Sequence, residues 1–506
     1  MTDRVELVER SLSADTYPTF GARVEEQAAF LREELARGAL DTDGFAVGLE
    51  LEVYAVDDGA LTRIPDDVFD ACNKELGLHN AELNTDPDPF TTAGIEAQAD
   101  ALRTQWAAAQ NAARDAGCDL VLDAMWTLPP DEGSYQYLAA TEQRDGVTVP
   151  SNMRAISRYW GIDRDCVRKA GGEIEFDVPG ASISFPTILF ESLATSIQPH
   201  VQIPSTDAFP RYYNAAIRTL GPVLALATNS PFLPGDLYDE DVDPERLLTE
   251  THHELRIAAF EQSVNQTGER KVRVPDDVET ATDVVDYLVA DPVVSPFLSE
   301  WLAGEGEGDV YADNFWELDH KRGTYWRWLR TVIGGDPVDG LSDERSLRIE
   351  YRPLPTQPSI RDIVGFQCLV GGLVNGLVVD DHPLTDLDWD AAEACFYSVV
   401  ENGLDAEFAW ITADGERTDD PETVFAEVFE YARRGLDDLG VAESTVETYL
   451  GPLETRWEAR TTPSQWKIER VREALADGAD LQAALATMQT EYVRRSNEHD
   501  TFAEWL

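Results

Sequence analysis

The stretch GLELEVYAV, residues Gly48 to Val56, has the alternation of apolar and polar residues that predicts a β-strand. Its apolar side carries Val47, Leu49, Leu51 and Val53, and its other side carries Gly48, Glu50, Glu52 and Tyr54. The segment begins with Phe45 and Ala46 and is largely apolar, as a buried strand is. Two adjacent glutamates in such a strand repel each other, so their charge needs compensation.

Three other segments carry polar side chains where a strand would place them on one face. Residues 79–87, HNAELNTDP, are expected to form a short strand that carries Glu82. Residues 193–204 alternate so that His200 and Gln202 share a face, and the strand within residues 346–362 does the same with Arg348, Glu350 and Arg352. Carboxylates at positions i and i+2 lie about 6.6 Å apart at Cα, close enough to flank a divalent cation. Mg²⁺ or Mn²⁺ is the compensating ion that we expect.

Each of these features also has a structural explanation. Glu50 and Glu52 would suit the solvated face of a strand in a very acidic protein. The arginines beside Glu350 could be its ion-pair partners, and His200 could be a hydrogen-bonded core residue. The sequence has no Walker lysine motif and no Rossmann glycine fingerprint, so a nucleotide would have to be held through metal and arginine.

The remaining chain predicts helices between the strands. Helices are expected at residues 22–38, 65–76, 94–116, 209–228 and 253–262, with a strand at 118–126. Residues 128–180 predict an irregular excursion over the sheet, and the acidic, glycine-rich residues 304–309 predict an exposed loop. Residues 363–379 carry no charge but are interrupted by Gln367, Asn375 and glycines, which favours a buried helix over a membrane span. Beyond residue 386 the pattern predicts helices alone.

Charge is the dominant global property of the chain. There are 96 acidic and 40 basic residues, giving a formal net charge of −56. Such self-repulsion suits a salty cytoplasm, where screening is strong, and we expect a halophilic, cytoplasmic protein. No basic stripe is present to bind nucleic acid or an anionic membrane. The N-terminus lacks the apolar core of a signal peptide, and the odd number of cysteines, without a C-x-x-C pair, predicts reduced thiols: Cys72, Cys118, Cys166, Cys368 and Cys395.

Taken together, these motifs resemble glutamate-cysteine ligase family 2 of the glutamine-synthetase-like superfamily. The likeness comprises GLELEV, AELNTDP, QPHVQ, ATNSPF, HELRIAAFEQS, RIEYRPLPTQPSIRD and ENGLDAEF, in the family's order from about residue 44 to 410. The chain departs from the family where His200 is followed by Gln202 instead of a second histidine, and in the acidic stretch after NSPF. The excursion at 128–180 and the helices beyond 410 also exceed the compact members.

The resemblance implies an α+β fold, in which a curved antiparallel sheet flanked by helices surrounds magnesium ions and ATP. We expect three units: an N-terminal helical segment (1–40), a catalytic core (41–385) and a C-terminal helical region packed on the core (386–506). The implied metal ligands are Glu50, Glu52, Glu82 and Glu350. Catalysis is implied for Arg352, Glu350 and His200, nucleotide binding for His200, Gln202, Arg348 and Arg352, and substrate binding for Asn84, Thr85, Asn229 and Arg256.

The implied reaction is the ATP- and Mg²⁺-dependent joining of the γ-carboxyl group of glutamate to an amine such as cysteine, through an acyl phosphate. Its partners would be small molecules, namely ATP, glutamate and an amine, and the question of a homo-oligomer stays open. Two alternatives also stay open at this point. One is a metal-dependent hydrolase that uses the same carboxylates with water, and the other is a non-catalytic relative that binds ligands.

Overall fold

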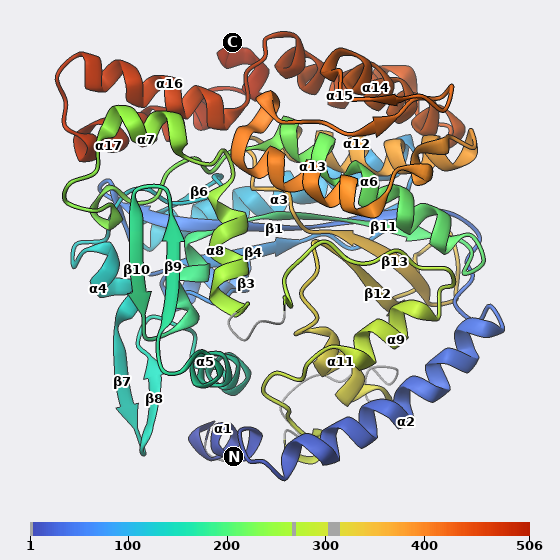
Figure 1. Ribbon diagram of the computed structural model, residues 1–506, viewed down its shortest axis with the longest axis horizontal. Coiled ribbons are helices and arrows are strands. Elements are labelled where there is room, and N and C mark those ends of the chain that lie inside the picture. The colour runs from blue at the N-terminus through green and yellow to red at the C-terminus, as the bar shows by residue number, and fades with distance from the viewer. Residues whose placement is uncertain (1–3, 266–269, 302–313) are drawn as a thin grey trace.

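A curved antiparallel β-sheet forms the centre of the protein in the computed structural model, which describes residues 4–265, 270–301 and 314–506 (Figure 1). The long strand β1 (Ala46–Asp57) lies in the middle of this sheet, which has nine strands among the described residues. Its neighbours are β11 (Ile197–Ile203) on one side and β4 (Asn80–Asn84) on the other. The remaining strands are β2 (Ala60–Leu61), β3 (Asn73–Lys74), β5 (Asp88–Pro89), β6 (Asp119–Val121), β12 (Leu329–Gly335) and β13 (Ser346–Tyr351). The expected fold class is confirmed.

The strand register places the polar side chains on one face of this sheet. Glu52 pairs with Glu82 on β4, while His200 on β11 pairs with Gly48 on one side and Glu350 on the other. Side chains at directly paired positions point to the same face. The four polar strand segments found in the sequence therefore share one side of the sheet.

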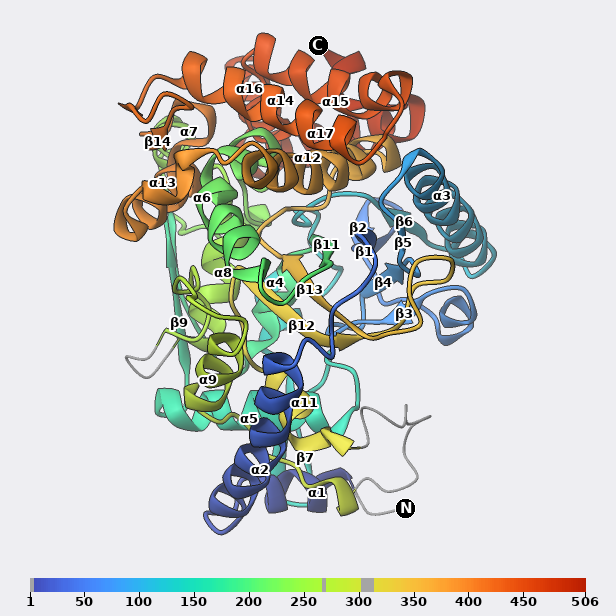
Figure 2. The ribbon, with the colours of Figure 1, turned by 90° about the vertical axis from the view of Figure 1, so that its right-hand side faces the viewer.

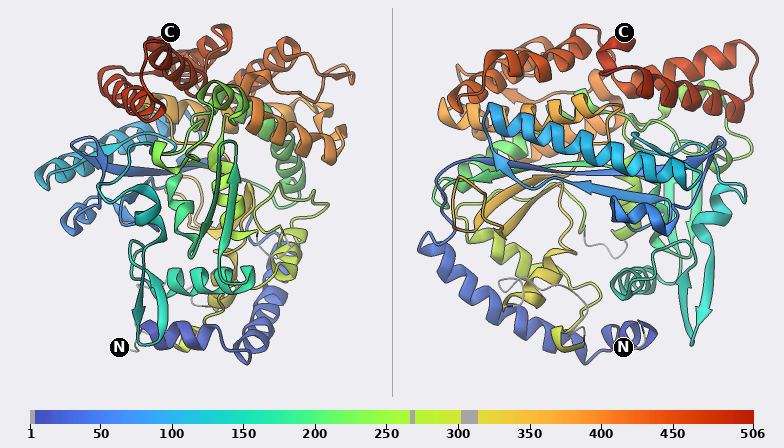
Figure 3. Two further views of the ribbon diagram at one scale, coloured as in Figure 1. Left: turned by 60° about the vertical axis from the view of Figure 1, so that its left-hand side comes forward. Right: turned by 180° about the vertical axis from the view of Figure 1, so that it is seen from behind.

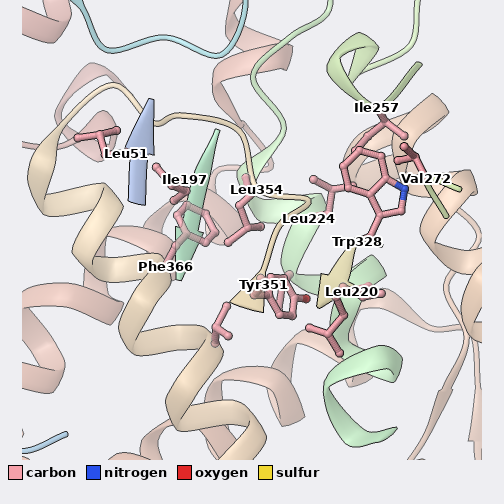
Figure 4. Close-up of a cluster of buried hydrophobic side chains, with 14 of the residues drawn as sticks. Leu51, Ile197, Leu220, Leu224, Ile257, Val272, Trp328, Tyr351, Leu354 and Phe366 are labelled. Carbon is pink, nitrogen blue, oxygen red and sulfur yellow. The ribbon is translucent and has the colours of Figure 1, made fainter. Parts of the chain in front are cut away.

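The other face of the sheet is apolar and packs against helices. Figure 4 shows Leu51 and Ile197 beside Phe366, and Tyr351 beside Leu220. Phe366 belongs to α12 (Ile360–Val379) and Leu220 to α6 (Phe209–Ala227), and α3 (Thr92–Asp115) also contacts α12 on this side (Figure 3).

Helix α12 is the central helix of the apolar layer. It is the one helix of the described residues that is long and apolar enough to cross a membrane, but 94% of its most apolar window is buried inside the protein, so this is weak evidence for a span. The prediction of a buried helix is confirmed. A Cβ atom on Gly376 would lie 2.0 Å from the Tyr431 carbonyl oxygen, so glycine allows the neighbouring helix to approach this closely.

The C-terminal helices lie on the side of the sheet away from the polar face (Figure 1). They comprise α13 (Trp389–Asn402), α14 (Pro421–Asp438), α15 (Glu443–Glu458), α16 (Pro463–Ala476) and α17 (Leu481–Glu498), with a small hairpin of β14 (Trp410–Ile411) and β15 (Arg417–Thr418). Two buried ion pairs join them to the core, Lys467 with Asp123 at 2.5 Å and Arg456 with Asp362 at 2.8 Å.

A second group of helices faces the polar side of the sheet across a gap that holds the cavities described below (Figure 2). It contains α2 (Thr16–Ala36), α5 (Ser157–Ala170), α8 (Leu255–Val264), α9 (Asp283–Ala290) and α11 (Trp316–Arg322), with α1 (Arg4–Ser11) beside α5. Helix α2 is joined to α11 where Arg23 and Gln27 bind Glu317, both at 2.8 Å.

Several elements differ from the sequence-based expectations. The helix expected at 65–76 is a short 3₁₀ turn, Asp66–Asp70, followed by strand β3, because pairing with β4 replaces the local helical preference. The excursion at 128–180 is more regular than expected. It contains α4 (Ser134–Ala139), the hairpin of β7 (Thr141–Arg144) and β8 (Val147–Pro150), α5, and β9 (Ile174–Val178), which pairs with β10 (Ala181–Phe185).

The acidic stretch after NSPF is partly helical, with α7 at Pro244–Glu250. Residues 304–309 lie outside the described residues.

Candidate active site

Two adjoining cavities lie between the polar face of the sheet and the helices opposite. The cavity of about 340 Å³, here called the arginine cavity, is lined by His200, Arg322, Arg330, Arg345 and Arg348 together with an apolar wall. The cavity of about 330 Å³, here called the glutamate cavity, is lined by Glu52, Glu75, Glu82, Glu191 and Arg352 among others. Glu50, Arg322 and Arg330 line both, so the two cavities meet at these residues.

Three carboxylates converge in the glutamate cavity. Glu52, Glu75 and Glu82 each offer an oxygen, and the three oxygens lie within 4.8 Å of one another. Glu52 is oriented by residues in and just before β11, since it accepts hydrogen bonds from the Ser196 backbone N–H at 2.7 Å and the Gln198 amide at 3.1 Å. Glu82 lies opposite Glu52 on β4, and Glu75 follows the edge strand β3.

The electrostatics of this group fit a divalent cation. Burial, with the charges of the neighbouring glutamates adding to it, raises the pKa of Glu75 to about 8 and that of Glu82 to about 9. Burial also raises the pKa of Glu191 to about 8, with Glu52 adding to the effect. Several carboxylates in one cavity cannot all ionise without a counter-charge. Oxygen ligands alone are what Mg²⁺ and Mn²⁺ prefer, so the residues present fit such an ion.

A second group with metal-ligand geometry consists of Glu50, His200 and Glu350, where the two cavities meet. His200 Nε2 lies 3.3 Å from Glu50 Oε1. Burial works to raise the pKa of Glu50, but the hydrogen bond and charge of His200 outweigh it and leave that pKa below its usual value.

Glu350 is also held by arginines from both sides. The Arg330 guanidinium donates to its two oxygens at 2.7 and 2.8 Å, and Arg352 Nη1 donates to Oε1. Burial opposes ionisation, yet the charges of these arginines hold the pKa of Glu350 well below its usual range. The ion-pair explanation of the R-x-E-x-R pattern therefore holds for Arg352 but not for Arg348, which donates to the Asp336 carbonyl. The part of Glu350 in metal binding stays a prediction.

The four residues expected to bind nucleotide divide into two kinds. His200 and Arg348 line the arginine cavity, and Arg352 lines the glutamate cavity, where it also donates to Gln198 Oε1 at 2.5 Å. Gln202 lines neither cavity, because its amide donates to the Gly44 carbonyl at 3.0 Å and the side chain is buried.

The four residues expected to bind substrate line neither cavity. Asn84 is exposed at the end of β4, on the same face as Glu50, with which it pairs. The other three are engaged with the framework. Thr85 lies on the opposite face and accepts from the Leu49 N–H at 2.9 Å, the buried Asn229 donates to the Thr356 carbonyl at 2.8 Å, and Arg256 donates to the Pro353 carbonyl. These contacts position β1 and the segment after β13 and leave little freedom to bind a substrate.

Sequence reasoning missed several charged residues that line the cavities, among them Glu75, Glu191, Arg158, Arg322 and Arg330. Glu75 fell within the expected helix at 65–76. Glu191 stands alone in the apolar stretch TILFESLA, and an isolated carboxylate in such a stretch is a signal that could have found it. The three arginines come from segments without a distinctive pattern.

The family model of glutamate-cysteine ligase family 2 matches residues 46–499. The chain belongs to this family. The match covers the whole sheet and most of the C-terminal helices and begins after α2. The protein is therefore a carboxylate-amine ligase. No curated protein matches the sequence significantly.

Two solved structures share the fold of this ligase. The glutamate-cysteine ligase of Francisella tularensis in complex with AMP has a TM-score of 0.52 and 13% identity, with 91% of this chain and 90% of that chain covered. The bifunctional glutathione synthetase of Pasteurella multocida has a TM-score of 0.51 and 14% identity, and the match covers 94% of this chain but only 54% of that chain.

Proposed function

We propose that the protein is an ATP- and Mg²⁺-dependent ligase that joins the γ-carboxyl group of glutamate to an amine, with cysteine as the expected amine. The observation that carries this proposal is the pair of adjoining cavities, in which glutamates with metal-ligand geometry lie beside several arginines. Metal-bound phosphates need carboxylates on one side and arginines on the other.

The chemistry follows from the poor reactivity of a carboxylate toward an amine. An oxygen of the γ-carboxylate attacks the γ-phosphorus of ATP, the bond to ADP breaks, and an acyl phosphate forms. The amine nitrogen then attacks the carbonyl carbon, and phosphate leaves with the electron pair of its C–O bond. Bound Mg²⁺ would supply neutralisation of the charge on the phosphate oxygens.

The chain's own residues have distinct parts in this scheme. Glu52, Glu75 and Glu82 would hold one metal ion. Glu50 and His200 would bind metal at the boundary of the two cavities. Arg330 and Arg322 line that boundary, so they would contact the transferred phosphoryl group. The attacking amine must lose a proton. Glu191 lines the glutamate cavity and belongs to neither of the two groups with metal-ligand geometry. It is therefore our candidate for the group that accepts this proton.

The test is ADP release in concentrated potassium chloride with Mg²⁺, ATP, glutamate and a panel of amines, with the product identified by mass. We expect ADP only when glutamate and one class of amine are both present. ADP release without an amide product, or none with any pair, would contradict the ligase proposal.

A further inference from the structure

Arg158 differs from the other arginines of the glutamate cavity because it has no partner. Arg330 and Arg352 bind Glu350, and Arg322 donates to Asp319 at 2.8 Å. Arg158, in the first turn of α5, makes no hydrogen bond or ion pair with any described residue, and its Nε is shielded from solvent. It is the one unpaired guanidinium that this cavity contains among the described residues.

An unpaired, half-buried guanidinium is unfavourable in the free protein. Burial lowers the pKa of Arg158, and the acidic Glu75 and Asp319 are near enough to oppose this shift without bonding to the group. Desolvating a cation without giving it a partner costs free energy, and a planar guanidinium is best satisfied by a carboxylate or a phosphate. Arg158 is therefore suited to bind an anionic group of a ligand.

Gly323, at the end of α11, lies close to this guanidinium. A Cβ atom there would lie 1.6 Å from Arg158 Nη2, so a larger residue would displace the group. Gly323 itself lines the glutamate cavity. The position of Arg158 thus depends on a residue from another element, as in a site with defined geometry.

The rest of the cavity wall identifies the kind of anion. Beyond the carboxylates, the wall includes the apolar side chains of Ile162, Ile188, Phe260, Val264 and Trp326. A ligand that reaches from the carboxylate cluster to Arg158 therefore carries one polar end, an apolar stretch and an anionic end. A dicarboxylic amino acid has this pattern, and a nucleotide phosphate does not.

We propose that Arg158 binds the α-carboxylate of the acid substrate, and that it thereby selects a dicarboxylic amino acid over acids with a single carboxylate. This inference rests on the proposed ligase function and adds the residue that recognises the non-reacting end of the substrate. The reacting γ-carboxyl group then lies toward the carboxylate cluster, where the phosphoryl group arrives.

The experiment compares Arg158→Gln with the parent enzyme, using glutamate and its α-amide, isoglutamine, as alternative acids. In the parent, isoglutamine should have a KM about 10- to 100-fold above that of glutamate, because a charge-assisted hydrogen bond is lost. In Arg158→Gln the KM of glutamate should rise by a similar factor, the two acids should become nearly equivalent, and the KM of ATP should not change. Arg158→Lys should recover part of the difference.

Two further variants separate binding from folding. Gly323→Ala keeps the arginine but displaces it, so it should raise the KM of glutamate as Arg158→Gln does. Arg168→Gln is the matched control on the same helix, because Arg168 is exposed, binds Asp165 and lines neither cavity. It should leave both KM values unchanged.

Binding of glutamate without ATP, measured as the shift in melting temperature, tests the inference even if no amine supports turnover. A shift in the parent that disappears in Arg158→Gln supports it. An equal shift in both proteins, unchanged discrimination between the two acids, or a rise in the KM of ATP alone would overturn it. Absence of ADP release in the parent would count against the ligase function instead.

Discussion

At the scale of single residues, the adjacent glutamates of β1 have different surroundings. Glu50 lies beside His200, which lowers its pKa below the usual value despite burial, whereas burial raises the pKa of Glu52 in spite of Arg352 and the hydrogen bonds from Ser196. The two side chains belong to different groups with metal-ligand geometry. The negative charges of Glu50 and Glu52 are therefore compensated at two different places in the site.

We expect Glu52→Gln to separate stability from activity. Without metal, the change removes one of several mutually repelling carboxylates, so the variant should melt at or above the parent in the presence of a chelator. With Mg²⁺ and ATP, the parent should gain on the order of 2.7 kcal/mol at a hundred times the dissociation constant, and the variant much less. ADP formation should fall by orders of magnitude.

Thermal melts with and without Mg²⁺, together with ADP release, measure these effects. Glu96→Gln is a suitable control because Glu96 is an exposed residue of α3 that lines neither cavity. Normal turnover and a full Mg²⁺ shift in Glu52→Gln would show that Glu52 is not a metal ligand.

His79 should make the protein sensitive to acid. Burial lowers its pKa to about 4, and the ring is held neutral between Ser192 O at 2.8 Å and Tyr137 Oη at 3.0 Å. In the unfolded chain the pKa returns to about 6.5, so the unfolded state binds the proton first. The stability contributed by the neutral ring is present above pH 6.5 and is lost as the pH falls toward 4, by roughly 3 kcal/mol.

Denaturant unfolding between pH 7 and 4 in concentrated salt measures this loss. His79→Gln should be less stable at pH 7 but should show a shallower decline with falling pH. His499→Gln, at a partly exposed position just after α17, should leave the slope unchanged. An equal slope in the parent and His79→Gln would refute the role of this ring.

At the scale of elements, helix α2 completes the arginine cavity although it precedes the family match. Leu31 of α2 joins Leu288, Phe315 and Leu318 in an apolar wall of that cavity. If the cavity holds a nucleotide, this wall is where an apolar base would pack. Leu31→Ala should therefore raise the KM of ATP several-fold and leave the KM of glutamate unchanged.

The control for this prediction comes from the same helix. Leu35 is buried like Leu31, with 3% of its surface exposed in each case, but it does not line the cavity. Leu35→Ala should lower the melting temperature without changing the KM of ATP. Equal effects of both variants on that KM would mean that α2 acts only through stability.

The elements predicted correctly from sequence are those with a strong period. β1, β11 and β13 follow the alternation of a sheet with one apolar face, and α3, α6 and α12 follow helical spacing. Strand β3 was missed because it has two residues at the edge of the sheet and exists through its pairing with β4. Glu75 was not recognised as a site residue for the same reason, since its position depends on the pairing of β3 with β4.

At the scale of the whole molecule, the net charge of −56 should make stability depend on salt. Screening shortens the Debye length from about 10 Å at 0.1 M to under 3 Å at 3 M, which reduces self-repulsion in the compact state. The melting temperature should rise over this range of potassium chloride. Sucrose at matched osmolality is the control for preferential exclusion, and an unchanged melting temperature in salt would contradict the expected halophilic behaviour.

The division into units at 1–40, 41–385 and 386–506 stays a prediction. Helix α12 contacts β1 and β11 on one side and α14 and α15 on the other, so it connects the predicted core with the C-terminal helices. The buried pairs of Lys467 and Arg456 also cross this boundary.

The sequence by itself determined the fold class, the family and the strand face that carries Glu50, Glu52, Glu82, His200, Glu350 and Arg352, because period, spacing and residue type are local properties of the chain. Only the tertiary structure decided which charges meet. In the folded chain, Glu75 and Glu191 line the glutamate cavity, and Arg330 pairs with Glu350. Thr85, Asn229 and Arg256 make contacts with the framework, and Arg158 has no partner among the described residues. The physical reason is that charge compensation depends on distance in space, and segments far apart in sequence set that distance.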